Sequence, residues 1–245
     1  STPLVLAAVG ELVVEKSGVL NLGVEGMMII GAVTSFIVTY ETGSHFLGLI
    51  AAVISAGLVA SLFGLLTQYL LSNQVATGLA LTLFGLGLAS LIGQTYSGIS
   101  LNAFPGCCGY LLTEIPIIGS LLFNFDYLIY LSIIIVVSVY YFLNKTKLGL
   151  VLTAIGDSHD SAHSLGYSVK MVRLFAIIFG GSCAGLGGAY LSLVQTPMWV
   201  ENMTAGRGWI ALAIVVFAVW RPLWILVGAY IFGGITIIQL HVQAI

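Results

Sequence analysis

Residues 127–173 read YLIYLSIIIVVSVYYFLNKTKLGLVLTAIGDSHDSAHSLGYSVKMVR, and this stretch decides the fold. The apolar run Tyr127–Leu143 gives way at Asn144 to a polar segment, which closes with Lys170 and Arg173 before a second apolar run begins. An apolar helix of roughly 20 residues crosses the hydrocarbon core of a bilayer. The pattern therefore predicts two membrane-spanning helices joined by one polar loop, residues 144–173, that touches something in water.

The composition of the whole chain agrees with a membrane protein. Hydrophobic residues make up 59% of the 245 residues and charged residues only 7%, whereas soluble domains carry about 25% charged residues. The formal net charge of -2 gives no indication of a nucleic-acid partner. The chain starts at Ser1 without Met and ends in an apolar context at Ile245, and we expect it to be truncated at its termini.

Eight hydrophobic segments are expected, so the predicted fold class is all-α, a polytopic α-helical membrane protein. Six segments are long enough to cross: Leu22–Tyr40, Phe46–Leu71, Asn73–Gln94, Tyr127–Leu143, Leu174–Val194 and Leu223–Leu240. Two are short, Pro3–Val14 and Trp209–Trp220. The short segments either cross, tilted or extended at one end, or re-enter the membrane under cover of other helices.

The basic residues predict the orientation of these segments. If the 144–173 loop is cytoplasmic and the sides alternate, only Arg207 falls outside. The six basic residues that then fall inside are Lys16, Lys145, Lys147, Lys170, Arg173 and Arg221. This is a strong positive-inside pattern, and it favours crossing for the short segments. The outer loop, residues 95–125, is expected to pack on the rim as a lid or as a docking surface.

No constellation for catalysis or metal binding is visible in the sequence. A phosphate-binding G-x-x-x-x-G-K-[ST] motif is absent, and no nucleophile stands beside a base. His159 and His163 are four residues apart without a third ligand. The three cysteines, Cys107, Cys108 and Cys183, are expected to be unpaired. We therefore expect no enzyme, no metal and no cofactor.

Two features bear on helix packing. Glu25 either sits in the first turn of a helix capped by Asn21, where an acid suits the helix dipole, or serves as a polar anchor between helices, paired with Lys16. The second feature is the small-xxx-small spacing in residues 179–190, which lets helix backbones approach closely. The packing residues expected there are Gly181, Gly185 and Gly188.

Five stretches taken in order carry a family resemblance. They are SGVLNLGVEGMMIIGA (17–32), NQVATGLALTLFGLGLASLIG (73–93), GLVLTAIGDSHDSAHSLGYSV (149–169), FGGSCAGLGGAYLSL (179–193) and TAGRGWIALAIVVFAVWRPLW (204–224). Together they resemble the permease subunits of bacterial ABC importers. The branch they resemble most serves nucleosides and simple sugars with binding lipoproteins of the basic-membrane-protein type.

The resemblance implies an assembly. It implies one transmembrane permease domain, residues 1–245, in the multi-pass setting of the bacterial inner membrane. Its partners would be the lipid bilayer, a cytoplasmic ATPase subunit, a second and related permease, and a substrate-binding lipoprotein. The loop at residues 144–173 would be the element that couples to the ATPase, through Ala154, Gly156, Asp157, Ala162 and Gly166. Thr153 and Asp157 stand where the family usually has Arg and Glu.

The solute is expected to be nucleoside-like, with simple sugars and riboflavin-like compounds as alternatives. The sequence offers neutral polar and aromatic groups near helix ends, which either line the path or cap and anchor helices. They are Asn73, Gln74, Thr77, Gln94, Trp199 and Asn202. A secondary transporter or a channel is the rival interpretation. It would need intramembrane charges or inverted repeats.

Overall fold

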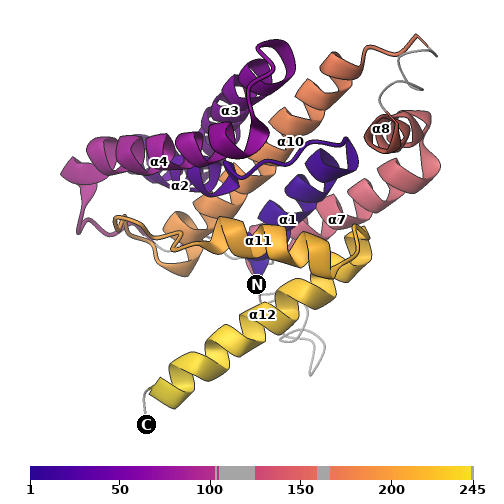
Figure 1. Cartoon of the computed structure of the whole chain (residues 1–245). Helices are drawn as coiled ribbons and strands as arrows, with labels where there is room; N and C mark the ends of the chain where they lie inside the picture. Colours follow the sequence, from indigo (N-terminus) through magenta and orange to yellow (C-terminus); the bar gives the residue numbers. More distant parts are fainter. Residues whose placement is uncertain (103, 105–124, 159–165, 244–245) are drawn as a thin grey trace.

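The computed structural model describes residues 1–102, 104, 125–158 and 166–243, which form a bundle of α-helices (Figure 1). The first half holds α1 (Thr2–Lys16), α2 (Val24–Thr42), α3 (His45–Gly64, extended by a π-helical turn Leu65–Tyr69) and α4 (Gln74–Gly93). The second half holds α7 (Tyr127–Lys145), α8 (Lys147–Asp157), α10 (Val169–Tyr190, extended by a π-helical turn Leu191–Gln195), α11 (Arg207–Phe217) and α12 (Pro222–Gln243). Six of these helices are long and apolar enough to cross a membrane, which confirms the all-α polytopic prediction.

The short helix α1 is the buried centre of the bundle. It packs against α10, α11, α7 and α12, and in Figure 1 it lies between α10 and α7. Every residue from Pro3 to Val14 is buried, including Glu11. A helix that is apolar on all sides belongs in such a position. At 15 residues it is only about 22 Å long, and its last two residues, Glu15 and Lys16, are half-buried.

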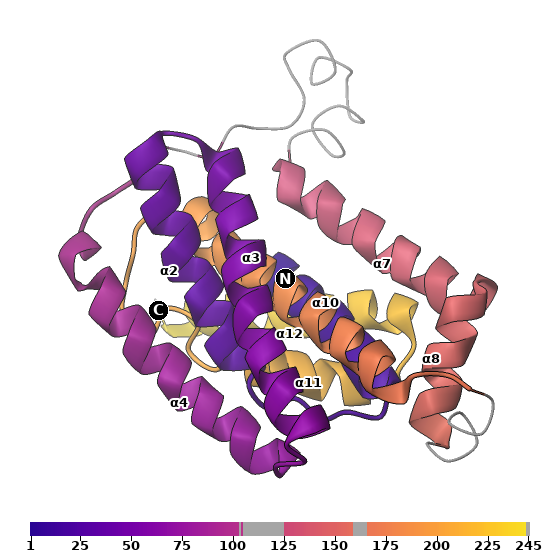
Figure 2. The ribbon, with the colours of Figure 1, turned by 90° about the horizontal axis from the view of Figure 1, so that it is seen from above.

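Small residues bring α10 to within backbone contact of α2 and α3. A Cβ added to Gly185 would lie 2.5 Å from both the Ala52 carbonyl oxygen and the Ala56 Cβ of α3. A Cβ on Gly188 would overlap the Met28 carbonyl oxygen of α2. The glycine face of α10 is therefore filled by two neighbouring helices, and Figure 2 shows α10 crossing under α3.

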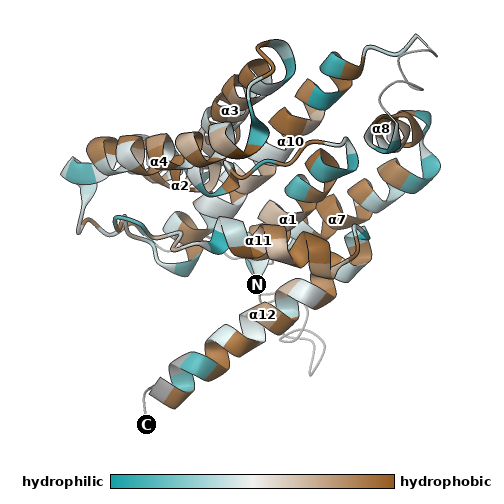
Figure 3. Cartoon of the chain, viewed as in Figure 1, coloured by the Kyte–Doolittle hydropathy of each residue, from teal (hydrophilic) through white to brown (hydrophobic). Residues whose placement is uncertain are grey.

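Basic residues gather at one end of the bundle. Lys16 and Arg221 line one hollow there, Arg173 donates to the Ser17 carbonyl at 3.0 Å, and Lys170 lies over the Tyr69 ring. Lys145 and Lys147 flank the α7–α8 junction at the same end. In Figure 3 hydrophilic colour is concentrated where α1 and α7 end and α10 begins, while the helix bodies are hydrophobic. We call this the basic end.

The segment 196–221 crosses from the opposite end to the basic end in two parts. Helix α11 has 11 residues, about 16 Å, which is half of the hydrocarbon thickness of about 30 Å. An irregular stretch precedes it, with Trp199 seated against Gly93 at the far end of α4. After α11 the chain reaches Arg221 beside Lys16. The segment therefore runs from one end of the bundle to the other as a loop followed by a half-length helix.

One carboxylate holds the start of this half-length helix. Glu25 is 3% exposed, and its Oε1 accepts hydrogen bonds from the Thr204 hydroxyl at 2.5 Å and the Gly206 N–H at 2.8 Å. Its Oε2 accepts from the Gly208 N–H at 2.6 Å. The N–H groups of a first helical turn have no partner inside the helix and attract negative charge. Glu25 of α2 thus supplies the anion that α11 needs.

The sequence TAGRG, residues 204–208, contains residue types that suit the contact with Glu25. Thr204 contributes the hydroxyl donor, and Gly206 takes a left-handed φ of +81°, which glycine adopts without steric cost. Gly208 has no room for a side chain, because an added Cβ would lie 2.6 Å from the Glu25 Cα. Thr204, Gly206 and Gly208 therefore each have a physical reason in this motif.

The structure confirms the anchor interpretation of Glu25 and changes its partner. Glu25 binds the start of α11, so the expected pairing with Lys16 is wrong. The expected cap at Asn21 is also wrong. Helix α2 starts at Val24, and the Asn21 side chain accepts from the Gly23 N–H before the helix begins.

Replacing Gly185 by Leu should disrupt the bundle. The added side chain would meet the backbone of α3 and force the two helices apart, at a cost of about 3 kcal/mol or more. Gly234 on α12, which has no atom near its missing Cβ, provides the matched control as Gly234→Leu. We expect loss of monodisperse yield and thermal stability in detergent for Gly185→Leu alone. Equal stability of the two variants would contradict this packing.

Replacing Glu25 by Ala should release α11. Two buried donors and one half-buried donor would lose a charged acceptor, with a cost on the order of 3–5 kcal/mol. The control is Glu41→Ala, which removes an exposed carboxylate near the far end of the same helix and should cost about 1 kcal/mol or less. Thermal unfolding in detergent compares them. A Glu25→Ala protein as stable as the control would rule out the anchor.

Candidate functional site

A polar hollow of about 630 Å³ opens at the end of α4 opposite the basic end. Helix α4 provides one wall with Ser90 and Gln94. The irregular stretch before α11 provides another with Trp199 and Glu201. The remaining lining residues are Leu86, Gly87, Leu91 and Ser97. The walls thus come from two segments about 100 residues apart in the chain.

Two contacts keep these walls together. The Ser90 hydroxyl donates to the Glu201 carboxylate, and Trp199 is buried against Gly93, where a Cβ would overlap its indole. Short backbone bridges pair Trp199 with Ser97 and Met198 with Ser100. Trp199 is therefore a fixed wall of the hollow.

The hollow has the chemistry to bind a neutral, hydroxyl-bearing solute. The Glu201 carboxylate accepts hydrogen bonds, the Gln94 amide both donates and accepts, and the Ser97 hydroxyl does either. Glu201 is the only charged residue among those that line it, so an anionic solute would be repelled. An apolar wall, here Leu86 and Leu91, beside a few placed polar groups is the usual composition of a small-molecule site.

The irregular stretch before α11 is fixed to the bundle at two points. Trp199 is fixed at Gly93, and five residues later Thr204 is fixed at Glu25. Between them Asn202 adopts a positive φ of 57°, and its carbonyl accepts from the Ala205 N–H. The hollow and the Glu25 anchor are thus two ends of one short, constrained segment.

The six expected path residues fall into two groups. Gln94 and Trp199 line the hollow, and Asn202 lies in the constrained segment beside it. The other three lie at the start of α4, near the basic end, and tie the backbone there. The Asn73 side chain caps the Ala76 N–H, Gln74 accepts from the Leu20 N–H at 2.9 Å, and Thr77 shares a hydrogen bond with Ser72.

Sequence reasoning missed the polar partners that complete the hollow. Ser90 reads as an ordinary helical residue, and Glu201 reads as a boundary acid. The available signal was an acid two residues after a tryptophan in a loop that is otherwise apolar or neutral. The contact of Glu201 with Ser90 of α4 depends on tertiary structure.

The segment expected to couple to an ATPase, residues 144–173, contains α8, which follows α7 directly. Ala154 and Asp157 are exposed on α8, and Gly166 is exposed with a left-handed φ of +84°. Ala162 lies outside the described residues. The side chains of Leu152 and Ile155 are buried, so α8 presents one face to the bundle and another outward.

Gly156 faces its own chain rather than a partner. The position that a Cβ would take is filled by the Lys16 carbonyl oxygen, with the Gly18 nitrogen 3.2 Å away. Gly156 therefore makes a close backbone approach to the end of α1, and its expected role in coupling to an ATPase stays a prediction. Arg173 fixes the same turn by donating to the Ser17 carbonyl. Of the expected coupling residues on α8, Ala154 and Asp157 are the ones that are exposed.

The chain has recognisable relatives. The family model described as "Branched-chain amino acid transport system / permease component" matches residues 1–243. A Haloferax volcanii protein that is named for a glucose ABC transporter permease is 42% identical to this chain. The alignment covers 100% of this chain and 76% of the relative.

Two further relatives are 29% identical. One is a Lactococcus lactis nucleoside ABC transporter permease, aligned over 96% of this chain and 78% of its own. The other is a Bacillus subtilis guanosine ABC transporter permease, aligned over 95% and 77%. No solved structure matches the chain. The helical bundle, the multi-pass composition and these matches lead to one conclusion: this chain belongs to the family of permease components of branched-chain amino acid transport systems.

Proposed function

We propose that this chain is the permease subunit of an ATP-driven importer in the cytoplasmic membrane. It forms half of the translocation path for an uncharged solute that contains a sugar ring. The observation that carries this proposal is the hollow lined by Trp199, Gln94 and Glu201, directly connected to the half-length helix that Glu25 holds.

The relatives' names support two solute classes. The 42% identical relative is named for glucose, and two 29% identical relatives are named for nucleosides and guanosine. Both classes present neighbouring hydroxyls, which suit the Glu201 carboxylate and the Gln94 amide. Trp199 is buried and shapes the wall from behind, so the apolar surface that faces a base comes from Leu86 and Leu91. We favour a nucleoside because a base and a ribose would use both kinds of wall, and glucose is the second candidate.

The proposed mechanism places ATP hydrolysis on a separate ATPase subunit and couples it through residues 144–173. Ala154 and Asp157 would contact that subunit, with Ala162 and Gly166 completing the element. A second, related permease would supply the other half of the path, and a binding lipoprotein would deliver the solute. Because Gly156 rests on the end of α1, movement of α8 would push the central helix as well as α7 and α10.

Replacing Glu201 by Gln should weaken solute uptake. Loss of a charged acceptor costs about 1.5–3 kcal/mol, so the apparent affinity should fall about 10- to 100-fold. The complete transporter would be assayed for competition by guanosine, uridine, glucose, ribose and riboflavin. Asp126→Asn, an acid at the start of α7 that does not line the hollow, is the matched control. Unchanged affinity in Glu201→Gln, or robust flux from this chain alone in liposomes, would contradict the importer path.

Replacing Ala154 by Arg should uncouple transport from ATP hydrolysis. The side chain is exposed on α8, so the bundle should retain its stability to within about 0.5 kcal/mol, while the bulky charge blocks docking. The measurements are uptake, ATPase activity and a cysteine crosslink from position 157 to the ATPase. Ala76→Arg, exposed in the first turn of α4 and outside residues 144–173, is the control. Full transport with no crosslink would show that α8 does not couple transport to ATP hydrolysis.

A further inference from the structure

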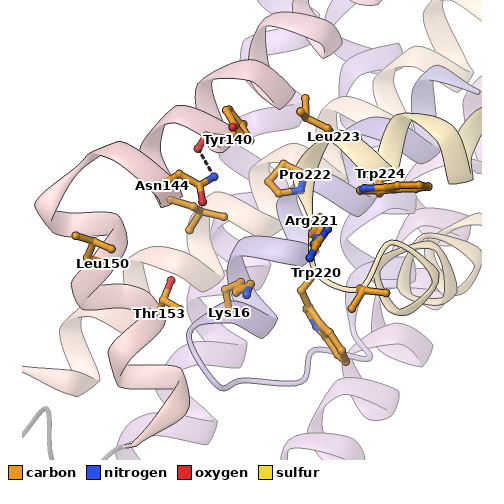
Figure 4. A pocket seen from close by; sticks show the side chains of 12 residues that line it. Lys16, Tyr140, Asn144, Leu150, Thr153, Trp220, Arg221, Pro222, Leu223 and Trp224 are labelled. Atoms are coloured by element: carbon orange, nitrogen blue, oxygen red, sulfur yellow. Dashed lines mark hydrogen bonds between the residues drawn. The ribbon is translucent and has the colours of Figure 1, made fainter.

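A second hollow, of about 600 Å³, lies at the basic end between α1, α7, α8 and the corner that joins α11 to α12. Figure 4 shows Lys16 and Arg221 reaching it from different elements, with Tyr140 and Asn144 of α7 along another wall. This hollow is separate from the polar hollow, which lies at the other end of the bundle.

The charge of this hollow is positive. Lys16 and Arg221 line it, and no carboxylate is among its lining residues. Among the described residues, neither cation has an ion-pair partner. The nearby Glu15 carboxylate accepts from the Trp220 indole N–H, so it is engaged with that ring. Helix α12 begins here at Pro222, and the start of a helix adds partial positive charge.

Apart from Asn144 and Thr153, the other lining groups are apolar or aromatic, and several of them are exposed. Trp224 is 52% exposed, Tyr140 40% and Leu150 60%. Trp and Tyr side chains are enriched at the level where bilayer meets water. A free inorganic ion would bind the two cations and leave the apolar surface exposed to water. An amphiphile would contact both the cations and the apolar surface.

The backbone presents these groups at some cost in strain. Val219 and Trp220 adopt left-handed φ values of 50° and 52°, which residues other than glycine rarely do. The resulting corner places Trp220, Arg221 and Pro222 in the wall of the hollow. The strained turn is thus the feature that brings Arg221 opposite Lys16.

We propose that this hollow binds the phosphodiester headgroup of an anionic phospholipid. Lys16 and Arg221 hold the phosphate by charge-assisted hydrogen bonds, and the acyl chains lie along Leu150, Trp224 and the neighbouring bilayer. Basic pockets between transmembrane helices are suited to such headgroups. Because α8 forms one wall and the α11–α12 corner another, the bound lipid bridges the coupling segment to α12.

Lipid binding by the purified full chain tests this assignment. Phosphatidylglycerol is titrated into detergent-solubilised protein, with phosphatidylcholine of the same acyl chains and inorganic phosphate as separate probes. We expect phosphatidylglycerol to bind and to raise the Tm, and the other two to have no effect. In the double variant K16Q/R221Q its affinity should fall about thirtyfold.

Two further variants serve as matched controls, one for the charge and one for the location of the cation. Arg221→Lys retains the charge and should retain most of the binding. Lys170→Gln removes a cation at the same end but outside the hollow and should bind like the unaltered chain. Equal affinity in K16Q/R221Q would overturn the proposal. Binding of inorganic phosphate alone would reassign the hollow to a free anion. Displacement of the lipid by the ATPase subunit would reassign it to a protein contact.

Discussion

The hydrogen bonds that the Glu25 carboxylate accepts from the start of α11 are the interaction on which the rest of the structure depends. In a bilayer every backbone N–H must find a partner inside the protein. A helix of 11 residues that begins within the bundle leaves such groups exposed unless another element supplies an acceptor. Glu25 supplies it, and Gly208 lets the two backbones come close enough for the contact.

This anchor connects the two ends of the molecule. On one side of α11, the constrained segment carries Trp199 and Glu201 into the polar hollow. On the other side, α11 leads to the corner that sets Arg221 beside Lys16. The buried helix α1 runs past α11 and ends under α8 at Gly156. Helix α8 therefore contacts α1, and α1 contacts α11, which follows the segment that lines the polar hollow. A displacement of α8 would be transmitted through these contacts.

The sequence predicted the elements well because apolar length and basic residues are local signals. The expected run Tyr127–Leu143 matches α7 to within two residues, and the basic residues that were expected on one side do share one end. The partner of Glu25 could not be predicted in this way, because Thr204 is 179 residues away. The direction that Gly156 faces and the tie between Ser90 and Glu201 also depend on tertiary packing.

Candidate path residues were the weakest part of the prediction for a physical reason. Neutral polar side chains near helix ends serve capping and solute binding equally well, since both need a hydrogen-bonding group beside exposed backbone. Asn73 and Gln74 bond to backbone N–H groups, whereas Gln94 lines the polar hollow. Only the three-dimensional position of each residue separates the two roles.

A double-mutant cycle on Glu25→Ala and Thr204→Val tests the central claim most directly. If the carboxylate holds α11 through this hydroxyl, the second substitution should cost much less once the first is present. The coupling in unfolding free energy should then be about 1–2 kcal/mol. Additive effects, with a coupling near zero, would show that Glu25 and the start of α11 are energetically independent and would contradict the account.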